Sequence, residues 1–169
     1  RYDRFNVQGS IDQVMSSPAV GDVTGDGTPD VVVGGMDGTL RVLDISNGAT
    51  LRSADVDTGS MIQSTPTLVD IDGDAALEVA VATVRRVPGA SGVRIYDMGG
   101  AAPALVFNKA SSSQSPDAGF FGSPVVGDVD GDGRPDVVAI GFDQRLHAWR
   151  LDGSYLPGFP LYTYDTSLS

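Results

Sequence analysis

Three short acidic segments constrain the fold of this chain more than any other feature of its sequence. They are residues 22–30, 70–78 and 128–136, and each lies between two apolar runs. The third reads Asp-Val-Asp-Gly-Asp-Gly-Arg-Pro-Asp, with carboxylates at positions 1, 3, 5 and 9 and glycines at positions 4 and 6. The second segment begins 48 residues after the first, and the third begins 58 residues after the second. The chain is therefore an internal repeat built around three loops of one kind.

The chemistry of these loops indicates a metal. Carboxylates crowded into nine residues repel one another unless a cation lies between them. Oxygen ligands at alternate positions of a loop bent by glycine are typical of a site for a hard cation, and Ca²⁺ is the first choice. An acidic turn without metal is the alternative interpretation, and the threefold recurrence of the pattern counts against it.

Two other calcium motifs can be excluded from the residues themselves. An EF-hand needs a bidentate carboxylate at position 12 and flanking helices, but position 12 is Val33, Val81 or Ala139, and the flanking segments have strand patterns. Thrombospondin-like calcium repeats contain cysteine, and this chain has none. The absence of cysteine also leaves the redox compartment open.

Hydrophobic patterning around each loop predicts four short strands and no helix. In the first repeat the strands are expected at 16–22, 30–35, 39–45 and 50–56, with tight turns at Asp37-Gly38 and Asn47-Gly48. The other two repeats follow the same order. Turns are expected at Asp143-Gln144 and Asp152-Gly153, a long surface loop at 111–119, and a last strand at 156–164.

Four antiparallel strands in each repeat of roughly 40–50 residues are typical of β-propeller blades. We therefore predict an all-β fold made of three such blades, with the small apolar first strand of each blade innermost and the more polar fourth strand at the outer edge. The predicted divisions are a lead-in strand at 1–15 and blades at 16–60, 61–115 and 116–169.

The charge balance excludes several classes of partner. The formal net charge is −11, and half of the 22 acidic residues lie in the three loops, three in the first and four in each of the others. Three bound dications would remove much of this imbalance. The sequence has no basic stripe, so we expect no nucleic-acid partner and no binding to an anionic membrane surface. No stretch is long and apolar enough for a transmembrane helix, so membrane insertion is not expected.

One stretch carries a resemblance to a known family. Residues 121–128 read Phe-Gly-Ser-Pro-Val-Val-Gly-Asp and run into an Asp-x-Asp-x-Asp-Gly-x-x-Asp loop and an apolar strand. This resembles the FG-GAP repeat, also called the VCBS-type repeat, of integrin α subunits and many bacterial surface and secreted proteins. The resemblance covers the chain from residue 16 to about residue 164. It implies a calcium-binding β-propeller, usually with six to eight blades.

The resemblance also implies the metal ligands: side-chain oxygens from positions 1, 3, 5 and 9 and the backbone carbonyl of position 7. The predicted ligands are Asp22, Thr24, Asp26, Thr28 (carbonyl) and Asp30 in the first loop, Asp70, Asp72, Asp74, Ala76 (carbonyl) and Glu78 in the second, and Asp128, Asp130, Asp132, Arg134 (carbonyl) and Asp136 in the third. Two departures from the pattern stand out. Thr24 offers a hydroxyl in place of a carboxylate, and Ala75 stands at position 6, where the other loops have a glycine free to adopt a positive φ. We therefore expect up to three structural Ca²⁺ ions, with the third loop binding best.

Other candidate sites are weaker. His147 is the only histidine, and a packed or edge-strand residue is the better interpretation than a catalytic one. An aromatic group near the C-terminal end is expected to pack between blades, with a carbohydrate-stacking surface as the alternative. Its members are Trp149, Tyr155, Phe159, Tyr162 and Tyr164.

The function predicted from these observations is non-catalytic. We expect a calcium-binding module of an extracellular or cell-surface protein, used for adhesion or ligand recognition. Low-affinity calcium loops suit the millimolar Ca²⁺ found outside the cell. The alternatives are the propeller part of a calcium-dependent secreted carbohydrate-active enzyme and a self-assembling structural subunit.

The predicted partners are of two kinds. The first is a protein or carbohydrate ligand. The second is the remaining propeller blades, since three blades are too few to close a ring and would leave apolar faces exposed. Those blades would come from the same polypeptide, from another chain or from identical copies in an oligomer.

Overall fold

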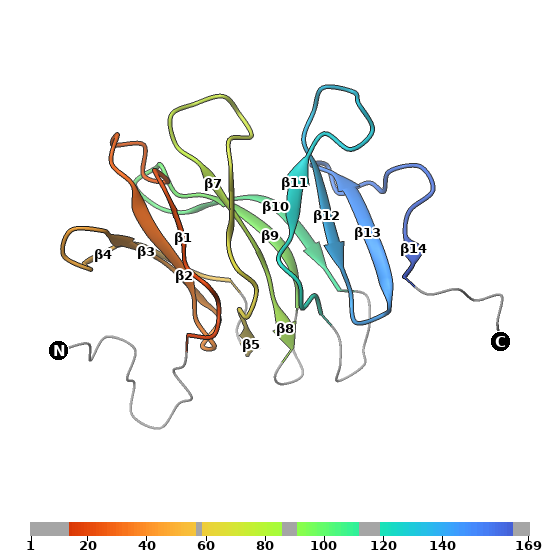
Figure 1. Ribbon diagram of the computed structural model, residues 1–169, viewed down its shortest axis with the longest axis horizontal. Coiled ribbons are helices and arrows are strands. Elements are labelled where there is room, and N and C mark those ends of the chain that lie inside the picture. The colour runs from red at the N-terminus through yellow and green to blue at the C-terminus, as the bar shows by residue number, and fades with distance from the viewer. Residues whose placement is uncertain (1–13, 57–58, 86–90, 112–118, 164–169) are drawn as a thin grey trace.

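The computed structural model describes residues 14–56, 59–85, 91–111 and 119–163. The described residues form an all-β structure without a helix, in which three sheets of four antiparallel strands lie side by side (Figure 1). None of these sheets closes on itself. The predicted fold class is confirmed, while the lead-in strand predicted at 1–15 falls almost entirely outside the described residues.

The three sheets repeat one strand order along the chain. The first contains β1 (Ala19–Gly21), β2 (Asp30–Gly34), β3 (Thr39–Asp44) and β4 (Thr50–Asp55). The second contains β6 (Thr67–Val69), β7 (Glu78–Ala82), β9 (Gly92–Asp97) and β10 (Ala104–Ala110). The third contains β11 (Val125–Gly127), β12 (Asp136–Ile140), β13 (Arg145–Arg150) and β14 (Leu161–Tyr162). A short two-stranded sheet pairs β5 (Ser60–Met61) with β8 (Val84–Arg85).

The predicted turns are present. Gly38, Gly48 and Gly153 have φ of 81°, 69° and 82°, the left-handed conformation that a glycine adopts without strain. In the remaining turn Gln144 has φ of 62° and is the one non-glycine residue with a positive φ in the described part of the chain.

The first strand of each blade is shorter than predicted. It was expected at 16–22 but spans only Ala19–Gly21. The Ser16 hydroxyl donates to the Gly34 carbonyl (3.1 Å) and accepts from the Gly34 N–H (2.9 Å). The serine side chain thus replaces the backbone hydrogen bonds that a longer first strand would make to Gly34. Pro18 follows, and it has no N–H to donate. Ser64 makes the same pair of bonds with Ala82 in the second blade.

The last strand is also shorter than predicted. A strand was expected over 156–164, but β14 contains only Leu161 and Tyr162. Pro157 and Pro160 interrupt this segment and cannot donate to a ladder. Tyr155, the residue before this segment, forms an isolated bridge with Trp149, and the Leu156 N–H donates to the Ala148 carbonyl at 3.0 Å.

The core consists of two apolar clusters, one on each side of the middle sheet. Val79 and Val81 of β7 belong to the cluster shared with the first sheet, and Ala80 and Ala82 belong to the cluster shared with the third. This alternation follows from the period of two in a strand. All five residues of β7 are buried, because the strand is covered on both faces.

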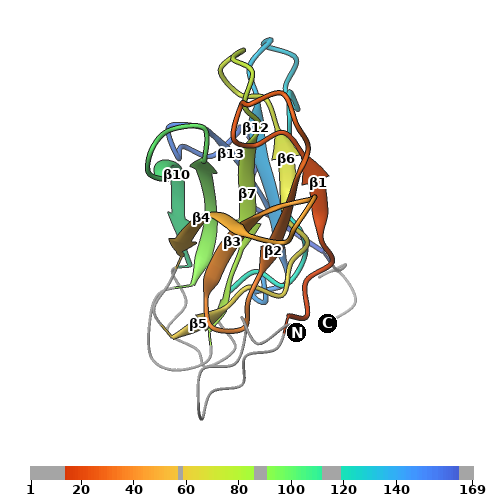
Figure 2. The same ribbon diagram turned by 90° about the vertical axis from the view of Figure 1, so that its left-hand side faces the viewer.

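All three acidic loops project from one end of the molecule (Figure 2). Each connects the first strand of a blade to the second, so β2, β7 and β12 all lead away from that end. The blades also contact one another near their first strands. The Thr67 hydroxyl donates to the Pro124 carbonyl, and the Ser123 hydroxyl accepts from the Thr65 N–H (2.9 Å).

Candidate metal centres

The carboxylate at position 9 closes each loop. Asp30, Glu78 and Asp136 begin the second strand of their blades and are only 1%, 2% and 1% exposed. Each accepts the N–H of position 2 of its own loop, at 3.1, 2.7 and 3.0 Å. A buried carboxylate therefore ties the start of every loop to its end.

The carboxylate at position 1 organises the turn of the third loop. Asp128 Oδ1 accepts the N–H groups of Gly131 (2.7 Å) and Asp132 (3.1 Å), and Oδ2 accepts that of Gly133 (2.9 Å). Asp22 makes the corresponding three bonds in the first loop. Gly131 and Gly133 have φ of 79° and 83°, so the geometry depends on glycine at positions 4 and 6.

The second loop differs at position 6, as its alanine predicts. Gly73 at position 4 has φ of 83° and donates to Asp70, but Ala75 has no positive φ. Among the hydrogen bonds of the described residues, none joins Ala75 to Asp70. The Asp74 N–H turns to the Asp72 carboxylate instead (3.1 Å).

The second and third loops bring carboxylates together. The oxygens of Asp70, Asp72 and Glu78 lie within 4.8 Å of one another, and so do those of Asp128, Asp130 and Asp136. Calcium binds oxygen at 2.3–2.6 Å, so two ligands of one ion can be at most about 5 Å apart. Positions 1, 3 and 9 of these two loops could therefore hold one metal ion between them. They are the two groups of this kind among the described residues.

The first loop does not form such a group. Thr24 occupies position 3, and its hydroxyl donates to Asp30 Oδ2 at 3.0 Å. The third carboxylate that the other loops supply is therefore replaced by a donor that partners the position 9 carboxylate.

The position 5 carboxylates stay outside the converging groups. Asp26, Asp74 and Asp132 each accept the N–H of position 7, at 2.8, 2.6 and 2.9 Å. These contacts stabilise the turn locally. The predicted ligand role of position 5, and that of the carbonyl oxygens of Thr28, Ala76 and Arg134, remain predictions.

Two of the predicted ligands have shifted pKa values. Burial raises the pKa of Glu78, the Ile71 N–H opposes the shift, and the negative charges of Asp72 and Asp74 add to it. Hydrogen bonds from the hydroxyl and the N–H of Thr28 lower the pKa of Asp26. A cation between Glu78 and its acidic neighbours would favour the ionised form of Glu78.

An ion pair in the third loop was not predicted from the sequence. Arg150 Nη2 lies 2.7 Å from Oδ2 of Asp130, which is a predicted ligand. Arg150 ends β13, directly across the ladder from Asp136. In the first blade the corresponding position, across from Asp30, is Asp44. The loop motif contains no signal for this arginine, because only the strand register brings it to the loop.

The two weaker candidates lie in the third blade. His147 is 6% exposed and Trp149 1%, and Trp149 belongs to the core between the second and third sheets. The expectation that both pack in the structure is confirmed. Tyr162 is exposed and contacts Arg145 of its own blade, so the expectation that it packs between blades is wrong. Tyr155 is also exposed, Phe159 is half-buried, and Tyr164 lies outside the described residues.

Comparison with known proteins agrees with this geometry. The family model described as the FG-GAP-like repeat matches the chain twice, at residues 22–81 and 70–139. Each match begins at the first residue of an acidic loop and includes the loop that follows in the chain. No curated protein sequence matches the chain closely enough to count as a relative. Because the two matches together cover more than half of the sequence, the protein belongs to the FG-GAP-like repeat family.

Proposed function

We propose that this protein is a calcium-stabilised, non-catalytic recognition or adhesion module that works outside the cell. The observation that carries the proposal is the convergence of three carboxylates in each of two loops, Asp70, Asp72 and Glu78 in one and Asp128, Asp130 and Asp136 in the other. These loops occupy corresponding places in a family of repeats typical of extracellular proteins. No helix in the described residues is long and apolar enough to cross a membrane.

The chemistry of the loops favours calcium over magnesium. Magnesium demands near-ideal octahedral geometry at 2.0–2.1 Å, whereas calcium accepts irregular sets of oxygen ligands at longer distances. In the third loop Asp128 and Asp136 already accept backbone N–H groups, which limits how far their oxygens can move. A site held in this way suits the more tolerant ion.

The role of the ion would be structural. Each candidate site joins the end of a blade's first strand to the start of its second, so bound calcium would offset the repulsion between carboxylates that the fold itself brings together. Recognition of a protein or carbohydrate would then fall to surfaces that the blades hold in place.

Thermal unfolding tests this proposal. Melting curves in EDTA, Ca²⁺ and Mg²⁺ should show that Ca²⁺ raises the melting temperature more than Mg²⁺ does. At a concentration one hundred times the dissociation constant, each site adds about 2.7 kcal/mol to the free energy of unfolding. Asp72→Asn should reduce the calcium response, and Asp55→Asn, which removes the same charge away from the loops, should leave it intact. Identical curves in EDTA and calcium would refute the proposal.

The proposal extends to a further blade as partner. Ala80, Ala82, Val93 and Ile95 of the second blade belong to the core shared with the third. The matching face of the third blade presents Val138, Ile140 and Leu146, and Ile140 is 53% exposed. This apolar face has the character of one that packs against another FG-GAP-like blade. Light scattering tests this: association at micromolar concentration is expected, and a stable 17.5 kDa monomer would contradict it.

A further inference from the structure

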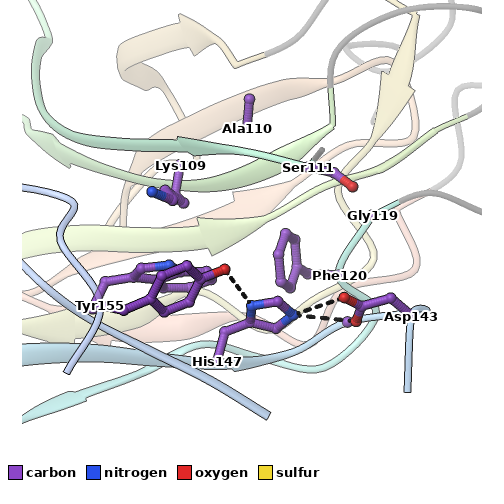
Figure 3. Close-up of a pocket in the computed structure, with 10 residues that line it drawn as sticks. Lys109, Ala110, Ser111, Gly119, Phe120, Asp143, His147 and Tyr155 are labelled. Atoms are coloured by element: carbon purple, nitrogen blue, oxygen red, sulfur yellow. Dashed lines mark hydrogen bonds and ion pairs between the residues drawn. The ribbon is translucent and has the colours of Figure 1, made fainter. Parts of the chain in front are cut away.

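A cavity of about 240 Å³ lies between the second and third sheets (Figure 3), and no residue of the acidic loops lines it. It is bounded by the end of β10, by Gly119 and Phe120, and by residues of β13 and its flanking turns. Asp143 belongs to the turn that follows β12, and β12 begins at the acidic loop. The cavity therefore extends toward the end of the blade opposite the acidic loop, and none of the predicted metal ligands lines it.

The side chains around this cavity are unusual for the chain as a whole. Lys109, His147 and Trp149 all line it, and each is the only residue of its type in the sequence. Asp143 and Tyr155 complete the polar lining together with Ser111. In a protein of net charge −11, Lys109 is the one cationic side chain among the described lining residues apart from any proton carried by His147.

A chain of hydrogen bonds fixes one wall of the cavity. His147 Nε2 lies 3.1 Å from both oxygens of Asp143, and Nδ1 lies 2.9 Å from the Tyr155 hydroxyl. An ionised carboxylate can only accept, so Nε2 carries a hydrogen, and in the neutral ring Nδ1 accepts from the tyrosine. The ring of His147 is also stacked on Trp149, with centroids 5.1 Å apart. Tyr155 is thereby held in one orientation although 40% of it is exposed.

Donors remain for a ligand on the other wall. Lys109 Nζ donates to the Gly153 carbonyl at 2.8 Å and lies 5.3 Å from the centre of the Tyr155 ring. An ammonium has three hydrogens, so it retains donor capacity.

The acceptor of the cavity is the Asp143 carboxylate, and it lies on the opposite side from the Lys109 ammonium. Figure 3 shows Lys109 and Asp143 on different sides, with Tyr155 and His147 between them. A ligand that satisfies both ends carries a negative group near Lys109 and hydrogen-bond donors near Asp143. The volume is below the range of about 300–1,000 Å³ typical of drug-sized ligands, so the ligand is small.

We propose that this cavity binds a small hydroxylated carboxylate, of the size and chemistry of a single sugar-acid unit. Its carboxylate lies against the Lys109 ammonium, its hydroxyl groups donate to Asp143, and the C–H face of its ring lies along the exposed ring of Tyr155. The site is formed by the two blades and uses no metal, so it stands independently of the function proposed for the acidic loops.

The single tryptophan makes the test direct. Fluorescence of Trp149, together with calorimetry, is followed while the protein in excess calcium is titrated with sodium glucuronate, glucose or sodium acetate at constant ionic strength. Glucose lacks the carboxylate and acetate lacks the hydroxyl groups. Saturable binding of glucuronate is expected, at least tenfold tighter than that of either comparison compound. A protein that binds none of them in either measurement holds only water in the cavity, and the proposal is then wrong.

Variants separate this site from general charge effects. Lys109→Gln should weaken glucuronate binding about tenfold or more, the scale of one charge-assisted hydrogen bond. Lys109→Arg should keep most of the affinity. Arg52→Gln makes the same change of charge on β4, where Arg52 donates to the Gly100 carbonyl, and should leave binding unchanged. Equal losses in Lys109→Gln and Arg52→Gln, or full binding by Lys109→Gln, would overturn the proposal.

Discussion

The ion pair between Arg150 and Asp130 leads to a quantitative prediction for the third loop. The guanidinium occupies an oxygen of a candidate calcium ligand, so the arginine and the metal compete for the same carboxylate. Replacing Arg150 by glutamine should therefore tighten calcium binding at this loop. The sequence pattern ranks the third loop as the best of the three, and this contact works against that ranking.

The magnitude follows from the distances. Arg150 Nη2 lies 2.7 Å from Asp130 Oδ2, and an ion on the same carboxylate would lie about 2.4 Å from its oxygen, which places the two cations roughly 5 Å apart. At the dielectric constant of water, a single and a double positive charge at that distance repel by about 1.7 kcal/mol. Screening at about 0.1 M salt removes less than half of this, because the Debye length is about 10 Å. We expect Arg150→Gln to tighten binding about fivefold to tenfold.

Calorimetric titration in an Asp72→Asn background, which removes a ligand of the second loop, isolates the third. Both side chains of the pair are partly exposed, at 38% and 26%, so its loss should cost the apo protein no more than about 1 kcal/mol. Arg145→Gln is the matched control, because Arg145 lies about 17 Å away along the same strand and contacts Tyr162. Unchanged or weaker calcium binding in Arg150→Gln would refute the electrostatic argument.

Two further predictions concern the loops themselves. Gly133→Ala should lower the free energy of unfolding by about 1–2 kcal/mol, because φ is +83° and an added Cβ would meet nothing within 4 Å, so the whole cost is conformational. Gly122→Ala, which also meets nothing but has no positive φ, is the control in urea unfolding, and equal effects would contradict the reasoning. The raised pKa of Glu78 means that the folded apo protein binds this proton more tightly than the unfolded chain does. In EDTA the ionised form of Glu78 therefore lowers the free energy of unfolding at a pH above the folded pKa, and this destabilisation is lost as the pH falls through that pKa. Glu78→Gln should therefore stabilise the protein relative to wild type in EDTA at about pH 7, with an advantage that shrinks toward about pH 5; an advantage that grows as the pH falls would show that the shift has the opposite sign.

Much of the fold could be predicted from the sequence because its signals are local. The acidic loops, the turn glycines and the alternation of apolar residues each act within a few positions, and the same local rules operate three times. The difference in the second loop is also local, because Ala75 alone decides whether position 6 can take the left-handed conformation. The errors fall at strand ends, where the Ser16 and Ser64 side chains replace backbone partners from a neighbouring strand.

The tertiary structure alone decided which of the repeated residues meet. Positions 1, 3 and 9 converge in the second and third loops, whereas the carboxylates at position 5 stay outside both groups. Arg150 reaches Asp130 only because the ladder places it across from Asp136. Lys109 and His147 line one cavity although they belong to different blades. Such contacts depend on strand register and on the packing of one sheet against the next, and both are set by the combined burial of many side chains far apart in the chain, which no short pattern encodes.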